Sequence, residues 1–154
     1  MKKYILIISA LLMASFANAQ SNKEEVDIMQ AQFGMDKKAL VAEFVKPSAS
    51  QKDAFWKLYD EYETQRKALG KQSIALLQQY ADNYKTLTSE QADTWTKKVM
   101  DLKKKTDDLI TTYYGKVRAI SDGIVALQFY QMENYILSGI RAQILSNVPF
   151  AEKK

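Results

Sequence analysis

The sequence predicts an all-α fold: an elongated arrangement of four helices built on a long antiparallel helical hairpin. Between residues 87 and 120, apolar side chains recur every three or four positions, which is the spacing of an amphipathic helix. A segment of matching character, ending in a first aromatic residue, opens 40 residues earlier at Pro47. Only Lys85 and Thr86 separate the two long segments, so the two helices must fold back on each other.

The first helix is predicted over residues 22–46. Gly34 lowers the stability of its middle by about 1 kcal/mol relative to alanine, so a continuous helix and a break at Gly34 are both open. Pro47 ends the helix, because the residue before a proline is disfavoured in the α region. The predicted apolar stripe contains Val26, Met29, Phe33, Leu40 and Phe44.

Residues 49–84 are predicted to form the second helix, which would be about 54 Å long at a rise of 1.5 Å per residue. Ser48 and Gln51 are its predicted caps, since a hydroxyl followed by glutamine three residues later can satisfy the free amides of the first turn. Arg66 and Ser73 interrupt the apolar stripe, whose members are Phe55, Tyr59, Tyr62, Leu69, Leu76, Tyr80 and Tyr84.

The third helix is predicted to follow Leu87 and to end near Ile120. Thr88 and Gln91 have the spacing of a complete capping box, and Leu87 precedes the cap where a hydrophobic staple is placed. The stripe that follows consists of Ala92, Trp95, Val99, Leu102, Thr106, Leu109, Tyr113, Val117 and Ile120.

The fourth helix is predicted after a break at residues 121–123, where Ser121 or Asp122 can act as the cap. Pro149 stops this helix, and residues 149–154 are predicted to form a C-terminal tail. The apolar stripe consists of Val125, Phe129, Met132, Ile136, Ile140 and Ile144.

Residues 1–19 have the pattern of a secretory signal peptide. Lys2 and Lys3 precede an apolar run over residues 4–16, and residues 17–19 form the small-x-small pattern of a cleavage site. The apolar run is shorter than the about 20 residues of a membrane span. We therefore expect cleavage after Ala19, a secreted periplasmic protein without a stable membrane anchor, and a single helical domain over residues 20–148.

The charged residues do not indicate a nucleic-acid-binding protein. Without residues 1–19, 20 Lys and Arg stand against 18 Asp and Glu, and the two signs are interleaved rather than gathered on one basic face. The chain contains no His and no Cys. The usual zinc, haem and di-iron sites and the His- or Cys-dependent catalytic mechanisms are therefore excluded. We expect no cofactor and no enzymatic activity.

Neighbouring acidic residues are the remaining candidates for a catalytic or metal-binding site. They occur at residues 24–25, at Asp60, Glu61 and Glu63, and at residues 107–108. A carboxylate-only catalyst or a calcium site is an open alternative for these groups. We expect solvent-facing helix surfaces instead, because lysines lie within one turn of them and no calcium-loop pattern is present.

A thin layer of helices leaves some apolar surface uncovered, and such a surface is typical of a protein-binding site. Tyr and Trp suit this role because they combine apolar area with a polar edge, and Met adapts to varied partners. The alternative is that these residues are buried against neighbouring helices or in a dimer interface. The candidate client-binding residues are Met29, Phe33, Met35, Trp56, Tyr114, Ile124, Tyr130 and Leu137.

The segment Leu87-Thr88-Ser89-Glu90-Gln91 resembles the LTxxQ motif of the Spy/CpxP family of periplasmic stress proteins, and Pro47-Ser48-Ala49-Ser50-Gln51 resembles a degenerate first copy. That family carries two such motifs at the starts of two long helices, and the similarity covers residues 26–144. The resemblance implies an elongated bundle that forms a homodimer. It also implies that the matching motif residues are structural caps: Ser48, Gln51, Leu87, Thr88 and Gln91.

Members of that family bind unfolded clients without ATP, or sense envelope stress and inhibit a membrane kinase. We therefore expect a periplasmic, ATP-independent, chaperone-like protein that binds partly unfolded proteins through exposed aromatic and Met side chains. Nearby lysines would attract the acidic groups of a client. The alternative is an envelope-stress sensor or adaptor that docks one specific membrane or envelope partner. An envelope structural protein that acts through dimerisation alone is a third option.

Overall fold

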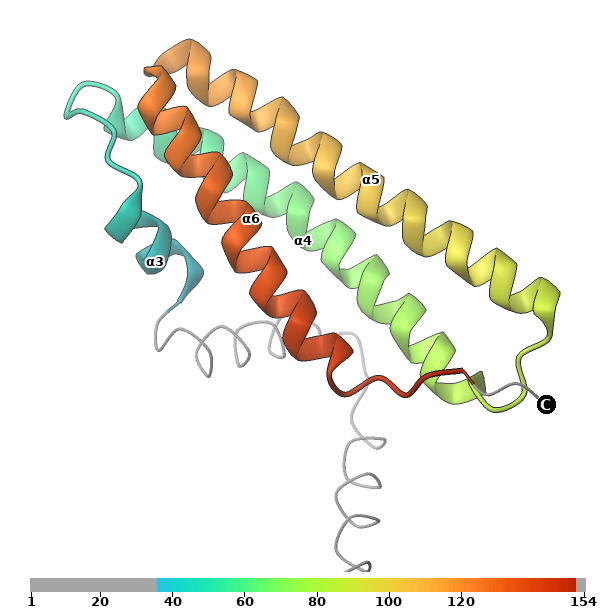
Figure 1. The fold of residues 1–154 in the computed structure, drawn as a ribbon. Helices are drawn as coiled ribbons and strands as arrows, with labels where there is room; N and C mark the ends of the chain where they lie inside the picture. Colours follow the sequence, from blue (N-terminus) through green and yellow to red (C-terminus); the bar gives the residue numbers. More distant parts are fainter. Residues whose placement is uncertain (1–35, 152–154) are drawn as a thin grey trace, which may run out of the picture.

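The computed structural model of the chain describes residues 36–151, and this part is all-α (Figure 1). It contains α3 (Lys37–Phe44), α4 (Lys52–Asn83), α5 (Ser89–Ile120) and α6 (Gly123–Leu145), with no strand among these residues. The predicted fold class is confirmed. The signal-peptide region and Met29, Phe33, Gly34 and Met35 lie outside the described residues. Across residues 36–151, no helix combines the length and apolar character needed to cross a bilayer.

The two longest helices, α4 and α5, lie side by side and run in opposite directions (Figure 1). Each contains 32 residues. Polar contacts join them at two levels along the pair: Trp95 Nε1–H donates to the Leu76 carbonyl at 2.8 Å, and Gln65 Nε2–H donates to Tyr113 Oη at 2.7 Å.

The last helix, α6, packs along α5, and α3 lies against α6 at the end where α4 begins (Figure 1). Because α6 contains 23 residues, it ends about 14 Å before the tip of the α4–α5 pair, at a rise of 1.5 Å per residue. The chain after α6 is tied to α4, since Tyr80 Oη donates a hydrogen bond to the Pro149 carbonyl at 2.7 Å.

The core is rich in aromatic side chains from α4, α5 and α6. The Tyr62 ring packs edge-on against Tyr113 and Phe129, with ring centroids 5.4 and 5.3 Å apart. Edge-to-face packing of this kind adds stability beyond the buried apolar area. The largest fully buried side chains are Phe55, Tyr59, Tyr62, Tyr113, Phe129, Glu133 and Ile136.

The structure corrects the prediction for the first helix. Asp36 has an extended backbone and its carboxylate accepts a hydrogen bond from the Ala39 amide, so α3 starts at Lys37 and a helix continuous over 22–46 is wrong. This new start sets which side faces inward: Lys37, Val41 and Val45 are buried. Phe44, which the stripe placed in the core, is 52% exposed.

The two predicted capping boxes differ. Gln91 N–H donates to Thr88 Oγ1 at 3.2 Å and Thr88 N–H donates to Gln91 Oε1 at 2.9 Å, so α5 has the complete box. At α4, Ser48 N–H donates to Gln51 Oε1 at 3.1 Å, but the Ser48 hydroxyl contacts Ser50 Oγ instead of an amide.

As a result, α4 starts three residues later than predicted and its N-cap residue, Gln51, makes no side-chain cap. Ser48 as a hydroxyl cap is therefore wrong. At α6 the choice between Ser121 and Asp122 is resolved, because Asp122 accepts hydrogen bonds from the Ile124 and Val125 amides.

Candidate functional site

The clearest exposed apolar surface lies on α6. We define the outer face of α6 by seven exposed residues on the side of the helix that points away from the core: Ile124, Leu127, Gln131, Tyr135, Ser138, Ala142 and Leu145. Ile124 is 65% exposed and Tyr135 is 63% exposed. Both side chains therefore present apolar area to solvent.

The outer face of α6 carries no charged residue. Among Asp, Glu, Lys and Arg, α6 contains only Glu133, which is completely buried, and Arg141, which lies at the edge of the face. The outward surface of α5 is different, since Lys103 pairs with Asp107 and Lys104 pairs with Asp108 there. A helix face that is exposed, apolar and free of charge is typical of a protein-binding surface rather than of a solvated one.

Two of the sequence-predicted residues meet beside this face. Tyr114 of α5 and Tyr130 of α6 are both exposed, and their rings form an edge-on pair with centroids 6.1 Å apart. They extend the apolar surface from α6 towards α5. Ile124 belongs to the outer face itself. Leu137 is only partly exposed and packs against the core.

Trp56 does not lie on this surface. It is half-buried on α4, where its ring packs edge-on against Phe55 and Tyr59 at 5.0 and 5.4 Å between centroids. The Lys38 ammonium lies 5.3 Å from the centre of the Trp56 ring. Trp56 is therefore part of the aromatic core that α3 adjoins, with one edge facing solvent.

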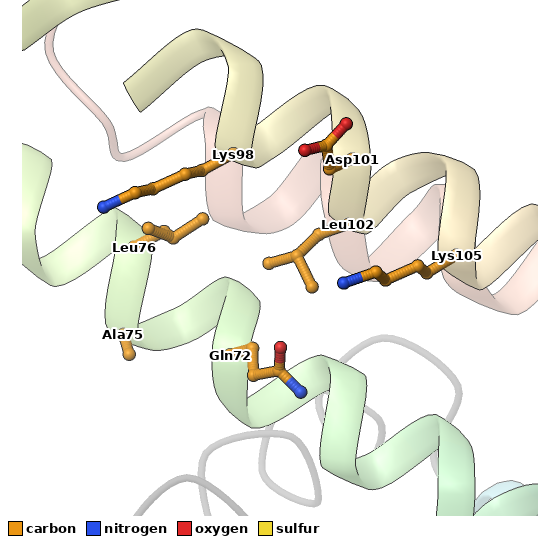
Figure 2. Close-up of a pocket in the computed structure, with 7 residues that line it drawn as sticks. All are labelled: Gln72, Ala75, Leu76, Lys98, Asp101, Leu102 and Lys105. Atoms are coloured by element: carbon orange, nitrogen blue, oxygen red, sulfur yellow. The ribbon is translucent and has the colours of Figure 1, made fainter. Parts of the chain in front are cut away.

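A shallow groove of about 310 Å³ lies between α4 and α5 (Figure 2). Figure 2 shows Leu76 of α4 and Leu102 of α5 facing each other across the groove, with Lys98 and Lys105 on either side of Leu102. Asp101 lies between the two lysines in the sequence and offsets part of their charge. The remaining lining residues are Gln72 and Ala75.

The most unusual feature is a buried ionic cluster at the α3 end. Lys37 Nζ donates to Glu63 Oε1 at 2.5 Å and to Glu133 Oε2 at 2.7 Å, which joins α3 to both α4 and α6. Tyr62 Oη also donates to Glu133 Oε2, at 2.7 Å, and Arg66 Nε donates to Glu63 Oε1 at 2.7 Å. We call these residues, together with Tyr59, the Lys37 cluster.

The charges in the Lys37 cluster set the protonation of its members. Burial alone would raise the pKa of Glu63, but the Lys37 ammonium and the Arg66 guanidinium outweigh it and hold this pKa below its usual value. Burial, followed by the nearby Glu133 carboxylate, raises the pKa of Tyr59 and of Tyr62. Glu63 is therefore ionised and both phenols are neutral at physiological pH.

The Lys37 cluster was not anticipated from the sequence, and it corrects one prediction. Glu63 was expected on a solvent-facing surface, but it is largely buried between two cations. The sequence signals that do exist are Arg66 on an apolar stripe and Glu133 inside an otherwise apolar helix. Among residues 36–151, no group of three acidic side chains could hold a metal ion.

No family model matches the chain, and no curated protein or solved structure matches it.

Proposed function

We propose that this is a periplasmic, ATP-independent, chaperone-like protein that binds partly unfolded proteins on the outer face of α6. The observation that carries the proposal is the exposed, charge-free apolar surface on that helix. Apolar segments of an unfolding client would lose water-exposed area by lying on this face, and no buried charge would oppose them. Tyr114 and Tyr130 would widen the contact. The sequence resemblance to the Spy/CpxP family supports the same proposal.

The proposed mechanism needs no chemical step. A client is held while its apolar segments are exposed and leaves when folding buries them. The lysine-rich outward surface of α5 would attract acidic segments of the client and add a salt-dependent contribution to association.

We also propose that the protein forms a homodimer through the same face. Residues of similar character lie at equal distances from a point between Asn134 and Tyr135. These pairs are Ile124 with Leu145, Leu127 with Ala142, and Gln131 with Ser138. A two-fold axis through that point would bring each pair together in an antiparallel helix contact. Client binding would then compete with self-association.

The test of the proposed function is suppression of client aggregation, followed by light scattering, at equal molar amounts of protein and denaturing client. The double variant Leu127→Glu/Leu145→Glu places charges on the outer face and should abolish suppression. Both side chains are exposed, so helicity should not change. The matched control is Met100→Glu, which changes an exposed apolar residue on α5 and should keep full activity.

The same assay separates the proposal from the alternative of an envelope-stress sensor or adaptor. A chaperone-like protein suppresses aggregation of several unrelated clients. A sensor or adaptor has little effect on them and instead retains one saturable partner from an envelope extract, again dependent on the outer face. No suppression by the wild-type chain across several clients would contradict the chaperone-like function.

A further inference from the structure

The site beneath α3 has the features of a helix-binding groove. The α3 backbone approaches α6 closely but not α4, which it reaches through the Lys37 and Lys38 side chains. Likewise, α4 and α6 have no close backbone approach and meet through side chains such as Tyr62 and Glu133. α3 therefore covers a seam between two helices, and does so with a single buried stripe.

One end of this groove recognises an ammonium group. The Lys37 ammonium is held by carboxylates of Glu63 and Glu133 and lies 5.7 and 5.3 Å from the ring centres of Tyr59 and Tyr62. Carboxylates combined with aromatic rings form a favourable site for an amine cation. Glu133 Oε1 is buried and makes no hydrogen bond within residues 36–151, so the site can accept a further donor.

The rest of the groove recognises aliphatic side chains at fixed spacing. Leu40, Val41 and Val45 follow Lys37 by three, four and eight residues, and all three are buried. The other side of α3 is exposed, including Ala39, Ala42 and Phe44. Specificity in this groove therefore comes from one cation and three aliphatic positions, which is the anchor pattern of helix-in-groove recognition.

Among the described helices, α3 is the shortest, and α6 is the only helix that its backbone approaches closely. It contains only 8 residues, and non-helical residues 45–51 join it to α4. Its departure would break no hydrogen bond of the α4, α5 or α6 ladders. Short elements with a low density of tertiary contacts are the ones that open by local unfolding.

We propose that this groove is an exchangeable helix-binding site. α3 and the extended Val45 after it occupy the groove within the chain. A partner helix with a lysine followed three and four residues later by aliphatic residues, and with a further aliphatic residue just after the helix end, binds there when α3 leaves. The site is separate from the outer face of α6 and does not depend on the function proposed for that face.

The test uses the full chain carrying Val41→Asp, which places a carboxylate at a completely buried position and should release α3. The probe is a fluorescent peptide with the sequence of residues 36–46 and blocked termini. Fluorescence anisotropy should show saturable binding to the variant. Binding to the wild-type chain should be at least tenfold weaker, because its own α3 competes at a high effective concentration.

Two controls test the recognition chemistry. A peptide with the Lys37→Ala change, and a receptor with Val41→Asp combined with Glu133→Gln, should each weaken binding at least tenfold. Adding Leu127→Glu to the Val41→Asp receptor should leave peptide binding unchanged, because Leu127 belongs to the outer face of α6.

Each other outcome would overturn the proposal. Absence of binding to a Val41→Asp chain that keeps its α4–α6 helicity would show that the groove does not accept a helix in trans. Global unfolding of that variant would show that α3 is an inseparable part of the core. Equal binding to wild-type and variant chains, or loss of binding with Leu127→Glu, would place the peptide on another surface.

Discussion

Lys37 is the residue at which three helices meet. Its ammonium bridges a carboxylate on α4 and one on α6 while its own backbone belongs to α3. Breaking such a buried pair is costly, because the remaining partner keeps its charge but loses its compensation. The Lys37 cluster therefore favours the arrangement of α3 in which the Lys37 ammonium reaches both carboxylates.

The pH dependence of stability should reveal this pairing. The Glu63 pKa is lower in the folded chain than its ordinary value of 4.5, so the unfolded chain binds a proton first as the pH falls. The stabilisation from Glu63 is complete above that ordinary value and is lost as the pH falls through the folded pKa. Glu63→Gln should lower the free energy of unfolding by about 3 kcal/mol at pH 7 and flatten its decline in acid.

Urea unfolding of both chains at pH 7 and in the acidic range measures this difference. Glu61→Gln is the control, because Glu61 is exposed on the same helix and should change neither the stability nor its pH profile. Parallel pH profiles for the wild type and Glu63→Gln would contradict the assigned role of Glu63.

Sequence reasoning could not assemble the Lys37 cluster because its members are far apart in the chain. Lys37 and Glu133 are 96 positions apart, and only the packing of α3 against α6 brings their side chains together. Glu63 also looked like an ordinary helix-surface acid, because Lys67 follows it at the spacing of a surface pair. A charged residue on an apolar stripe, as at Arg66, is the local signal that a buried partner exists.

At the scale of the elements, the two capping sites provide a matched comparison. Thr88→Ala removes a hydroxyl that accepts a hydrogen bond from the Gln91 amide and should destabilise the fold by about 1 kcal/mol. Ser48→Ala removes a hydroxyl that contacts only another serine hydroxyl, and should change stability by less than about 0.5 kcal/mol.

Chemical denaturation of both alanine variants tests this contrast, since neither position is buried. An equal loss for the two variants would show that the hydroxyls act alike, contrary to the observed hydrogen bonds. Ser48→Thr is a further check. The hydroxyl at position 48 does not reach an amide, so this change should not raise the stability.

Local sequence signals placed three of the four described helices to within three residues of their observed starts. These starts depend on residues that act over one turn, such as Thr88 and Asp122. For the first helix, the continuous form over residues 22–46 is wrong because Asp36 caps a helix that starts at Lys37, and the apolar periodicity on both sides of Asp36 gave no sign of this cap. Phe44 was consequently assigned to the wrong side.

At the scale of the whole molecule, the proposed homodimer makes a prediction about register. The chain contains no Cys, so introduced cysteines can pair only with each other. An antiparallel contact centred between Asn134 and Tyr135 places residue 127 next to residue 142 of the second copy. Mixing Leu127→Cys and Ala142→Cys chains under oxidising conditions should therefore give a covalent dimer.

Each cysteine variant alone is the control. In the proposed register, residue 127 lies about 22 Å from residue 127 of the second copy, too far for a disulfide. Efficient crosslinking of Leu127→Cys alone would indicate a parallel contact. A monomer in light scattering, or a dimer without crosslinking in the mixture, would contradict the proposed interface.

The fold class followed from composition and periodicity because long amphipathic helices dominate the chain. The exposed surface was predicted less well, since exposure depends on which neighbours a helix acquires. Tyr114, Tyr130 and Ile124 are exposed, whereas Trp56 and Leu137 pack against the core once α3 and α5 are in place. The sequence alone does not specify those neighbours.

The difference in length between α6 and the α4–α5 pair has a consequence for how this molecule can vary. Beyond the end of α6, two helices form a ribbon in which the Tyr80 ring of α4 packs against the Trp95 ring of α5. Deleting seven residues from each arm in this ribbon would shorten the rod by about 10 Å and leave the Lys37 cluster and the outer face of α6 intact. The length of the α4–α5 pair can thus change without altering either the Lys37 cluster or the outer face of α6.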